Sequence, residues 1–157
     1  MKLERNNTGI LSPKRQLNLY GYESHFNSFT KLHKKNKLPN VMLFSGQKGI
    51  GKSTFAYHLV NFLLSDGEKN KYSDDKFEIN PDNSSFNLIQ TNIHPNFFLL
   101  ENAADEESIK IDKIRNLLKF LNKTTYSKKL KLVFLDNAEY LNLNSSNALL
   151  KSLEEAQ

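Results

Sequence analysis

The sequence predicts an α/β fold in which helices cover a mainly parallel β-sheet. Short apolar runs bounded by glycine, proline or polar residues alternate with longer segments whose apolar residues recur at helical spacing. That alternation is typical of parallel strands joined by helices, with both faces of the sheet buried. The 157 residues, 38% hydrophobic and 25% charged, suffice for one domain with its own core.

The composition excludes several classes of protein. The chain has no cysteine, which excludes disulfides, thiolate metal sites and a cysteine nucleophile, and its 4 histidines do not share a metal-ligand spacing. No apolar run approaches the roughly 18 residues of a membrane span, and the polar N-terminus lacks the apolar core of a signal peptide. We therefore expect a cytoplasmic protein without membrane partners. The net charge of +5 is spread along the chain, and a solvated face explains it better than a nucleic-acid surface.

The first half of the chain contains a polar arm, two helical patterns and one apolar run. Residues 1–20 are polar, without a clear period, and form the expected N-terminal arm. Residues 22–36 carry aromatic residues at helical spacing, and residues 52–64 combine that spacing with a broad apolar face. Between them, the apolar run at 41–44, which is followed closely by Gly46, predicts a buried strand.

The second half begins with the most polar and most interrupted stretch of the chain. Residues 65–87 are rich in Asp, Asn, Ser and Lys, so we expect an exposed polar insertion. Apolar runs at 97–100 and 130–135 predict two further buried strands. Apolar residues at helical spacing predict helices over 111–121 and 144–155.

Residues 46–53 match the phosphate-binding pattern G-x-x-x-x-G-K-[ST], between a predicted strand and a predicted helix. Glycines let backbone N–H groups surround a phosphate, and the helix N-terminus favours its negative charge. Lys52 would meet the β- and γ-phosphates, and the Ser53 hydroxyl would bind Mg²⁺. A glycine-rich turn with an incidental lysine is the alternative, which the strand–loop–helix context disfavours. The expected nucleotide-binding residues are Gly46, Gln47, Lys48, Gly49, Ile50, Gly51, Lys52, Ser53, Thr54 and Asp136.

Asp136 is the second predicted Mg²⁺ residue, because it directly follows the strand predicted at 130–135. In P-loop proteins an acidic group at this position holds the metal ion, and we expect Asp136 to do so through a water molecule. The alternative is that Asp136 only caps a helix or turn after the strand. Many P-loop ATPases place next a glutamate that activates the attacking water, but this chain has Asn137. An amide orients water without accepting its proton, and Glu139 reads as a surface residue. We therefore expect nucleotide binding with little hydrolysis and assign no catalytic residue.

Several segments resemble the AAA+ domain of bacterial DNA polymerase III clamp-loader subunits. The similarity covers residues 16–157 and is greatest to subunits of the delta-prime type. The segments that carry it are Leu19 to Glu23, Leu38 to Gly46, His94 to Leu100, Ile111 to Arg115 and Asn147 to Glu155. The last of these, NALLKSLEE, is the most specific motif of the set.

The resemblance implies a P-loop NTPase domain of the AAA+ type, with three αβα layers. It would occupy residues 21–157 and is apparently truncated before the sensor 1 strand of the family. In that family the fourth strand lies between the Walker A and Walker B strands. Without it, we expect either that the strands at 41–44 and 130–135 pair directly or that a gap remains with two exposed edges. Residues Gly46 to Thr54 would form Walker A, and Asp136 would end Walker B.

The same resemblance implies the cofactors ATP and Mg²⁺, with Tyr20 and Gly21 near the adenine. Many members hold a small zinc module in the region of residues 65–93, but its cysteines are missing here, so no zinc is expected. The implied role is a delta-prime-like subunit that helps load the sliding clamp onto primed DNA during DNA replication. Its partners would be other clamp-loader subunits in a hetero-oligomer, the sliding clamp, and primer–template DNA through the assembled complex.

Three alternatives stay open. A gamma/tau-type clamp-loader ATPase would hydrolyse ATP, which Asn137 disfavours. A small P-loop kinase needs arginines near the γ-phosphate, and the arginines Arg5, Arg15 and Arg115 lie outside any lid-like segment. An interaction module with a vestigial P-loop would not need the intact Lys52.

Overall fold

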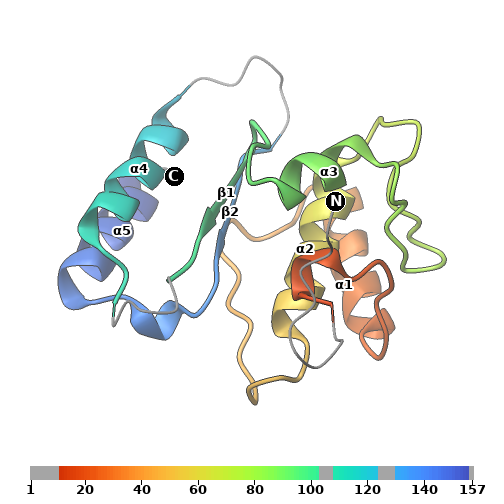
Figure 1. Ribbon diagram of the computed structural model, residues 1–157, viewed down its shortest axis with the longest axis horizontal. Helices are drawn as coiled ribbons and strands as arrows, with labels where there is room; N and C mark the ends of the chain where they lie inside the picture. The colour runs from red at the N-terminus through yellow and green to blue at the C-terminus, as the bar shows by residue number, and fades with distance from the viewer. Residues whose placement is uncertain (1–10, 103–107, 124–129, 156–157) are drawn as a thin grey trace. The chain divides into compact units, whose positions relative to one another are not determined.

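The computed structural model describes residues 11–102, 108–123 and 130–155, which form two compact units (Figure 1). The first unit ends at Ile93 and the second begins at His94. The first contains η1 (Pro13–Arg15), α1 (Glu23–Lys34), α2 (Lys52–Leu64) and α3 (Ser84–Gln90). The second contains β1 (Phe97–Leu100), α4 (Ile111–Asn122), β2 (Leu132–Leu135), η2 (Ala138–Tyr140) and α5 (Leu143–Glu155). No helix in these described ranges is long and apolar enough to cross a membrane.

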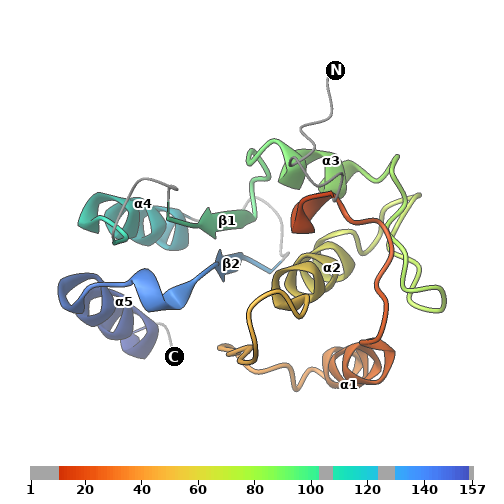
Figure 2. The same ribbon diagram turned by 60° about the horizontal axis from the view of Figure 1, so that its bottom comes forward.

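Helix α2 is the centre of the first unit. From Phe55 to its last residue every side chain is buried except that of Phe62, which is half-buried. Helix α1 lies beside it and contributes Phe26, which is fully buried (Figure 2). The Phe26 ring meets Phe55 and Phe62 edge-on and stacks on Tyr72 at a centroid distance of 5.1 Å. Such ring contacts add to the stabilisation that comes from apolar burial.

The N-terminal arm differs from its prediction in the part that the structure describes, whereas residues 1–10 lie outside that part. Leu19 is buried, and its N–H donates to the Phe77 carbonyl at 3.0 Å. The Ile79 N–H donates in turn to the Leu17 carbonyl at 2.8 Å. The arm is therefore packed into the first unit, because its backbone pairs with a segment far away in the sequence.

Residues 65–87 also differ from the exposed insertion that their polarity predicts. Tyr72, Ile79 and Phe86 are buried at intervals within the segment, and α3 begins at Ser84. These three residues lie seven positions apart, but polar residues occupy the helical positions between them, so a periodicity argument does not detect them. Several of its polar residues make hydrogen bonds to one another and to α2.

The Glu68 carboxylate closes this segment on itself. It accepts hydrogen bonds from the Ser84 N–H and from the side-chain amide of Asn83, both at 3.0 Å. Asn83 is fully buried and caps α3, because its side-chain oxygen accepts from the Phe86 N–H at 2.6 Å. The same oxygen accepts from the Asn61 amide of α2 at 3.1 Å. The Glu68 carboxylate thus orients the Asn83 side chain, which joins α3 to α2.

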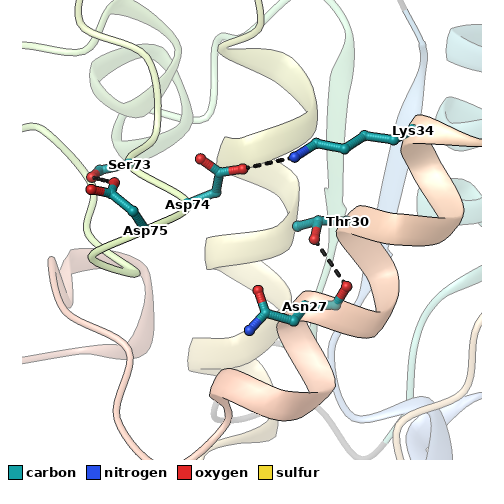
Figure 3. A network of polar contacts seen from close by, with 6 residues as sticks. All are labelled: Asn27, Thr30, Lys34, Ser73, Asp74 and Asp75. Atoms are coloured by element: carbon teal, nitrogen blue, oxygen red, sulfur yellow. Dashed lines mark hydrogen bonds and ion pairs between the residues drawn. The ribbon is translucent and has the colours of Figure 1, made fainter.

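An ion pair connects the same segment to α1 (Figure 3). Lys34 Nζ lies 3.2 Å from Asp74 Oδ2, and the two side chains expose 66% and 42% of their surface. An exposed pair of this kind contributes at most about 1 kcal/mol. Beside it, the Ser73 hydroxyl donates to the Asp75 carboxylate at 2.6 Å and lowers the pKa of Asp75. Burial of the aromatic residues, more than this pair, therefore holds the segment to α1.

The prediction of a buried strand from Val41 to Phe44 was wrong. The segment is not a strand, and Val41 and Leu43 expose 61% and 82% of their surface. Phe44 on the opposite side packs its ring against Phe29 and Phe55, so the alternation of a strand is kept. Within the described ranges, no backbone hydrogen bond involves this segment. A strand needs a paired neighbour, which a local apolar pattern does not supply.

The second unit confirms the other two strands and their parallel direction. Strands β1 and β2 pair with Phe97 opposite Leu132 and Leu100 opposite Leu135. Helix α4 joins the two strands and packs against β1 and α5 (Figure 2). The buried residues at the centre of this unit are Leu100, Ile109, Ile114 and Leu117. This two-stranded parallel sheet agrees with the α/β class, and the complete three-layer sheet stays a prediction.

His58 is a buried titratable group in the first unit. Its Nδ1 lies 3.0 Å from the hydroxyl oxygen of Tyr72, and the side chain is fully buried on α2. Burial lowers the pKa of His58 to about 4, against the opposing effect of a backbone hydrogen bond at Gln16. Burial likewise raises the pKa of Tyr72. Both side chains are therefore neutral in the folded protein at neutral pH.

We predict that Glu68→Ala lowers the free energy of unfolding by about 2 kcal/mol, because it leaves the donors at the start of α3 without their acceptor. Urea unfolding followed by circular dichroism measures the change. Glu78→Ala is the matched control in the same segment, since the Glu78 side chain makes no hydrogen bond to the described residues. Equal stability of the two variants would show that the Glu68 bonds do not hold the segment.

We predict that acid destabilises the protein through His58. The unfolded chain takes up a proton near pH 6.5 and the folded protein only near pH 4, so stability is full above pH 6.5 and falls between these values. Between pH 7 and pH 5 the free energy of unfolding should fall by roughly 2 kcal/mol more in the wild type than in His58→Gln. Urea titrations at the two pH values measure this difference. Replacement of the exposed His25 by Gln should leave the fall unchanged, and an equal fall in His58→Gln would disprove the assignment.

Candidate phosphate-binding site

The predicted phosphate-binding loop leads directly into the N-terminus of α2. Gly51 is the N-cap of that helix, and the first turn contains no acidic residue. In the described structure no side chain caps this end of α2. The first N–H groups of a helix lack intrahelical acceptors, and the helix dipole favours an anion there. The N-terminus of α2 is thus arranged to accept a phosphate.

Three glycines of the loop adopt backbone angles that other residues avoid. Gly46 has φ of 149°, Gly49 has φ of 82° and Gly51 has φ of 101°. A Cβ atom at Gly51 would also lie 3.3 Å from Cε2 of Tyr22, which is closer than most Cβ contacts. The loop therefore keeps this shape only with glycine at these three positions. Residues 46–50 are exposed, so a ligand would reach the loop from solvent.

Lys52 folds back across the loop that precedes it. Its ammonium donates to the carbonyl oxygens of Gly46 and Gln47, both at 2.9 Å. An ammonium carries three N–H donors, so a further donor is left for a phosphate oxygen. Ser53 and Thr54 follow in the first turn of α2 and are half-buried. The structure thus brings the loop, the lysine and the helix N-terminus together.

Tyr22 contacts the loop and was not singled out by the sequence. Its hydroxyl donates to the Ile50 carbonyl at 2.7 Å, and its ring lies 5.4 Å from that of Phe55. The hydrogen bond joins residues 28 positions apart, so no local spacing points to it. The neighbouring Tyr20 exposes 79% of its surface, and Gly21 turns the chain with φ of 76°.

Asp136 lies in the second unit, where it directly follows β2. Its N–H donates to the Leu100 carbonyl at 3.0 Å, which places Asp136 at the carboxyl end of the parallel pair. Asn137 follows with φ of 59° and ψ of 62° and is the N-cap of η2. Asparagine tolerates this left-handed conformation far better than glutamate, for which it costs about 1 kcal/mol or more. Asn137 thus suits the left-handed backbone at this position, in addition to lacking the carboxylate that would act as a general base.

A magnesium site is not completed by protein side chains alone. Among the residues that the structure describes, no group of three or more His, Cys, Asp or Glu side chains is placed to hold a metal ion. Mg²⁺ bound with a nucleotide takes most of its ligands from phosphate oxygens and water, with one or two ligands from the protein. A hydroxyl such as that of Ser53 and a carboxylate such as that of Asp136 have the chemistry that this demands.

The chain is similar to known proteins over most of its length. The family described as "DNA polymerase III, delta subunit" matches residues 21–157. DNA polymerase III subunit delta′ of Pseudomonas aeruginosa is 34% identical over 116 residues, which are 74% of this chain and 34% of that protein. The corresponding subunit of Bacillus subtilis is 32% identical over 125 residues, or 77% of this chain and 34% of that protein.

A third relative is the DNA polymerase III subunit gamma/tau of Mycoplasma genitalium. It is 31% identical over 125 residues, which are 78% of this chain and 19% of that protein. The chain thus spans about a third of the length of the delta′ relatives and less of the gamma/tau relative.

Proposed function

This chain belongs to the DNA polymerase III delta-subunit family, and from that membership we propose that it forms the nucleotide-binding part of a delta-prime-like clamp-loader subunit. The observation that carries the proposal is the glycine loop at the N-terminus of α2, with the Lys52 ammonium folded across it. Backbone N–H groups, a helix N-terminus and a lysine are the elements that cradle the phosphates of a nucleotide.

In this proposal ATP binds with its phosphates in the loop formed by residues 46–51. Lys52 turns its remaining N–H donor to the β- and γ-phosphates, and Ser53 binds the accompanying Mg²⁺. Asp136 holds the same ion through water. The metal would neutralise charge on the phosphates. Tyr20 and Gly21, which lie before Tyr22 and α1, would approach the adenine.

The proposed role in the cell is to help load the sliding clamp onto primed DNA during DNA replication. The partners would be other clamp-loader subunits in a hetero-oligomer, together with the clamp, and primer–template DNA through the assembled complex. Similarity to proteins named as DNA polymerase III subunits supports this role, and the chain spans about a third of the delta′ relatives.

A gamma/tau-type ATPase is the second candidate, because one relative carries that name. The residue after Asp136 separates the two functions. Asn137 cannot accept a proton from water, and its left-handed backbone disfavours a glutamate in the same place. We therefore favour a subunit that binds ATP and hydrolyses little of it.

We predict that the Lys52→Ala variant binds a fluorescent ATP analogue about tenfold or more weakly than the wild type, because a charged hydrogen-bond donor to the phosphates is lost. Fluorescence anisotropy titration of the 157-residue chain with Mg²⁺ present measures the two dissociation constants. Lys69→Ala is the matched control, since Lys69 is an exposed lysine outside the loop. Equal binding by wild type and Lys52→Ala would instead support an interaction module with a vestigial loop.

We predict that ATP turnover by the wild type stays within a factor of about two of the Asp136→Ala background, because no general base follows Asp136. Release of inorganic phosphate under saturating ATP measures this turnover. A wild-type rate well above that background, and abolished by Asp136→Ala, would contradict the non-hydrolysing assignment and favour the gamma/tau-type function.

A further inference from the structure

We propose that Tyr22 is a positioning residue for the phosphate-binding loop: its hydroxyl holds the Ile50 carbonyl and thereby fixes the direction of the Gly51 N–H that meets a phosphate. This inference rests on the proposed nucleotide binding and names a residue that the loop motif does not contain.

The hydrogen bond of Tyr22 fixes a carbonyl that has little else to hold it. The Tyr22 hydroxyl lies 2.7 Å from the Ile50 oxygen, a short bond for this type. The Ile50 side chain is 54% exposed, so packing of that side chain does not fix the peptide. The Ile50 N–H reaches the Gln47 carbonyl only at 3.5 Å, which is at the limit of a hydrogen bond.

The geometry of the peptide group passes this restraint on to Gly51. Every peptide bond between described residues is trans, so the Ile50 carbonyl and the Gly51 N–H lie in one plane and point in opposite directions. A glycine with φ of 101° has no side chain to restrict the rotation of this plane. The Tyr22 hydroxyl therefore supplies the restraint that glycine lacks, and the Gly51 N–H points away from the tyrosine.

The tyrosine itself is anchored on two helices. Its ring lies 5.4 Å from the Phe55 ring of α2 and 6.0 Å from the His25 ring of α1. Its backbone carbonyl accepts from the Phe26 N–H at 2.9 Å, the first bond of α1. Because the ring and the backbone of Tyr22 are both already held in place, little conformational entropy of this side chain is lost when the loop binds an anion. Such preorganisation of N–H groups is what a phosphate site requires.

The test compares Tyr22→Phe with the wild type in the full 157-residue chain. Phenylalanine keeps the ring against Phe55 and Gly51 and removes only the hydroxyl. We expect the affinity for both a fluorescent ATP analogue and inorganic tripolyphosphate to fall by about threefold to tenfold, the usual effect of one lost hydrogen bond. Because the contact is at an exposed site, the melting temperature without ligand should change little.

Tyr72→Phe is the matched control, since it removes the hydroxyl that lies 3.0 Å from His58 in the buried part of the same unit. It should lower the melting temperature and leave both affinities within about twofold of the wild type. If the loss of affinity in Tyr22→Phe merely accompanies a fall in melting temperature like that of Tyr72→Phe, the role is structural and the inference is wrong.

The remaining outcomes separate this inference from the proposed function. If the wild type binds ATP more tightly than Lys52→Ala while Tyr22→Phe binds as the wild type does, nucleotide binding stands and the inference fails. If Tyr22→Phe weakens the ATP analogue but not tripolyphosphate, the hydroxyl acts on another part of the nucleotide, which also overturns the inference. If the wild type and Lys52→Ala bind equally, the proposed function fails, and the inference fails with it.

Discussion

Helix α2 must be buried along its sides and open at its N-terminus, and the first unit is arranged around these two demands. The helix becomes buried at Phe55, within one turn of its half-buried start at Lys52. Helix α1 covers one side of it with Phe26 and Phe29, whose rings contact Phe55. The same ring of Phe55 touches Tyr22, so the packing that buries α2 also fixes the tyrosine that hydrogen-bonds to the loop.

Burying α2 requires hydrogen-bond partners for its own polar residues. Asn61 donates to Asn83, and His58 lies within hydrogen-bond distance of Tyr72. Ser65 at the end of the helix accepts from the Tyr72 N–H at 3.0 Å. Buried polar groups without partners would cost on the order of 1–3 kcal/mol each. The polar segment after α2 supplies a partner for one polar atom of each of these side chains, so part of its polarity serves internal hydrogen bonding.

The elements that could be predicted are those whose signal is local. Helices α4 and α5 and strands β1 and β2 lie within two residues of their predicted bounds, because each carries its own apolar period. The loop before α2 was predicted because its glycines, lysine and helix are contiguous. The strand at 41–44 was predicted wrongly, since a strand depends on a neighbour that its own residues do not specify. Tyr22 was missed for the same reason, because its contact with Ile50 is long-range.

The second glycine of the loop motif illustrates why a pattern and its physical cause differ. The motif assigns Gly51 to the close approach of a phosphate. The structure adds that a Cβ atom there would lie 3.3 Å from Cε2 of Tyr22. Displacing that ring would also move the hydroxyl from the Ile50 carbonyl, which is the bond that orients the adjoining N–H. Gly51 therefore contributes in two ways: its backbone adopts the required φ, and its lack of a side chain leaves space for the Tyr22 ring. Without that space, Tyr22 could not hold its position at the start of α1 and also contact the loop.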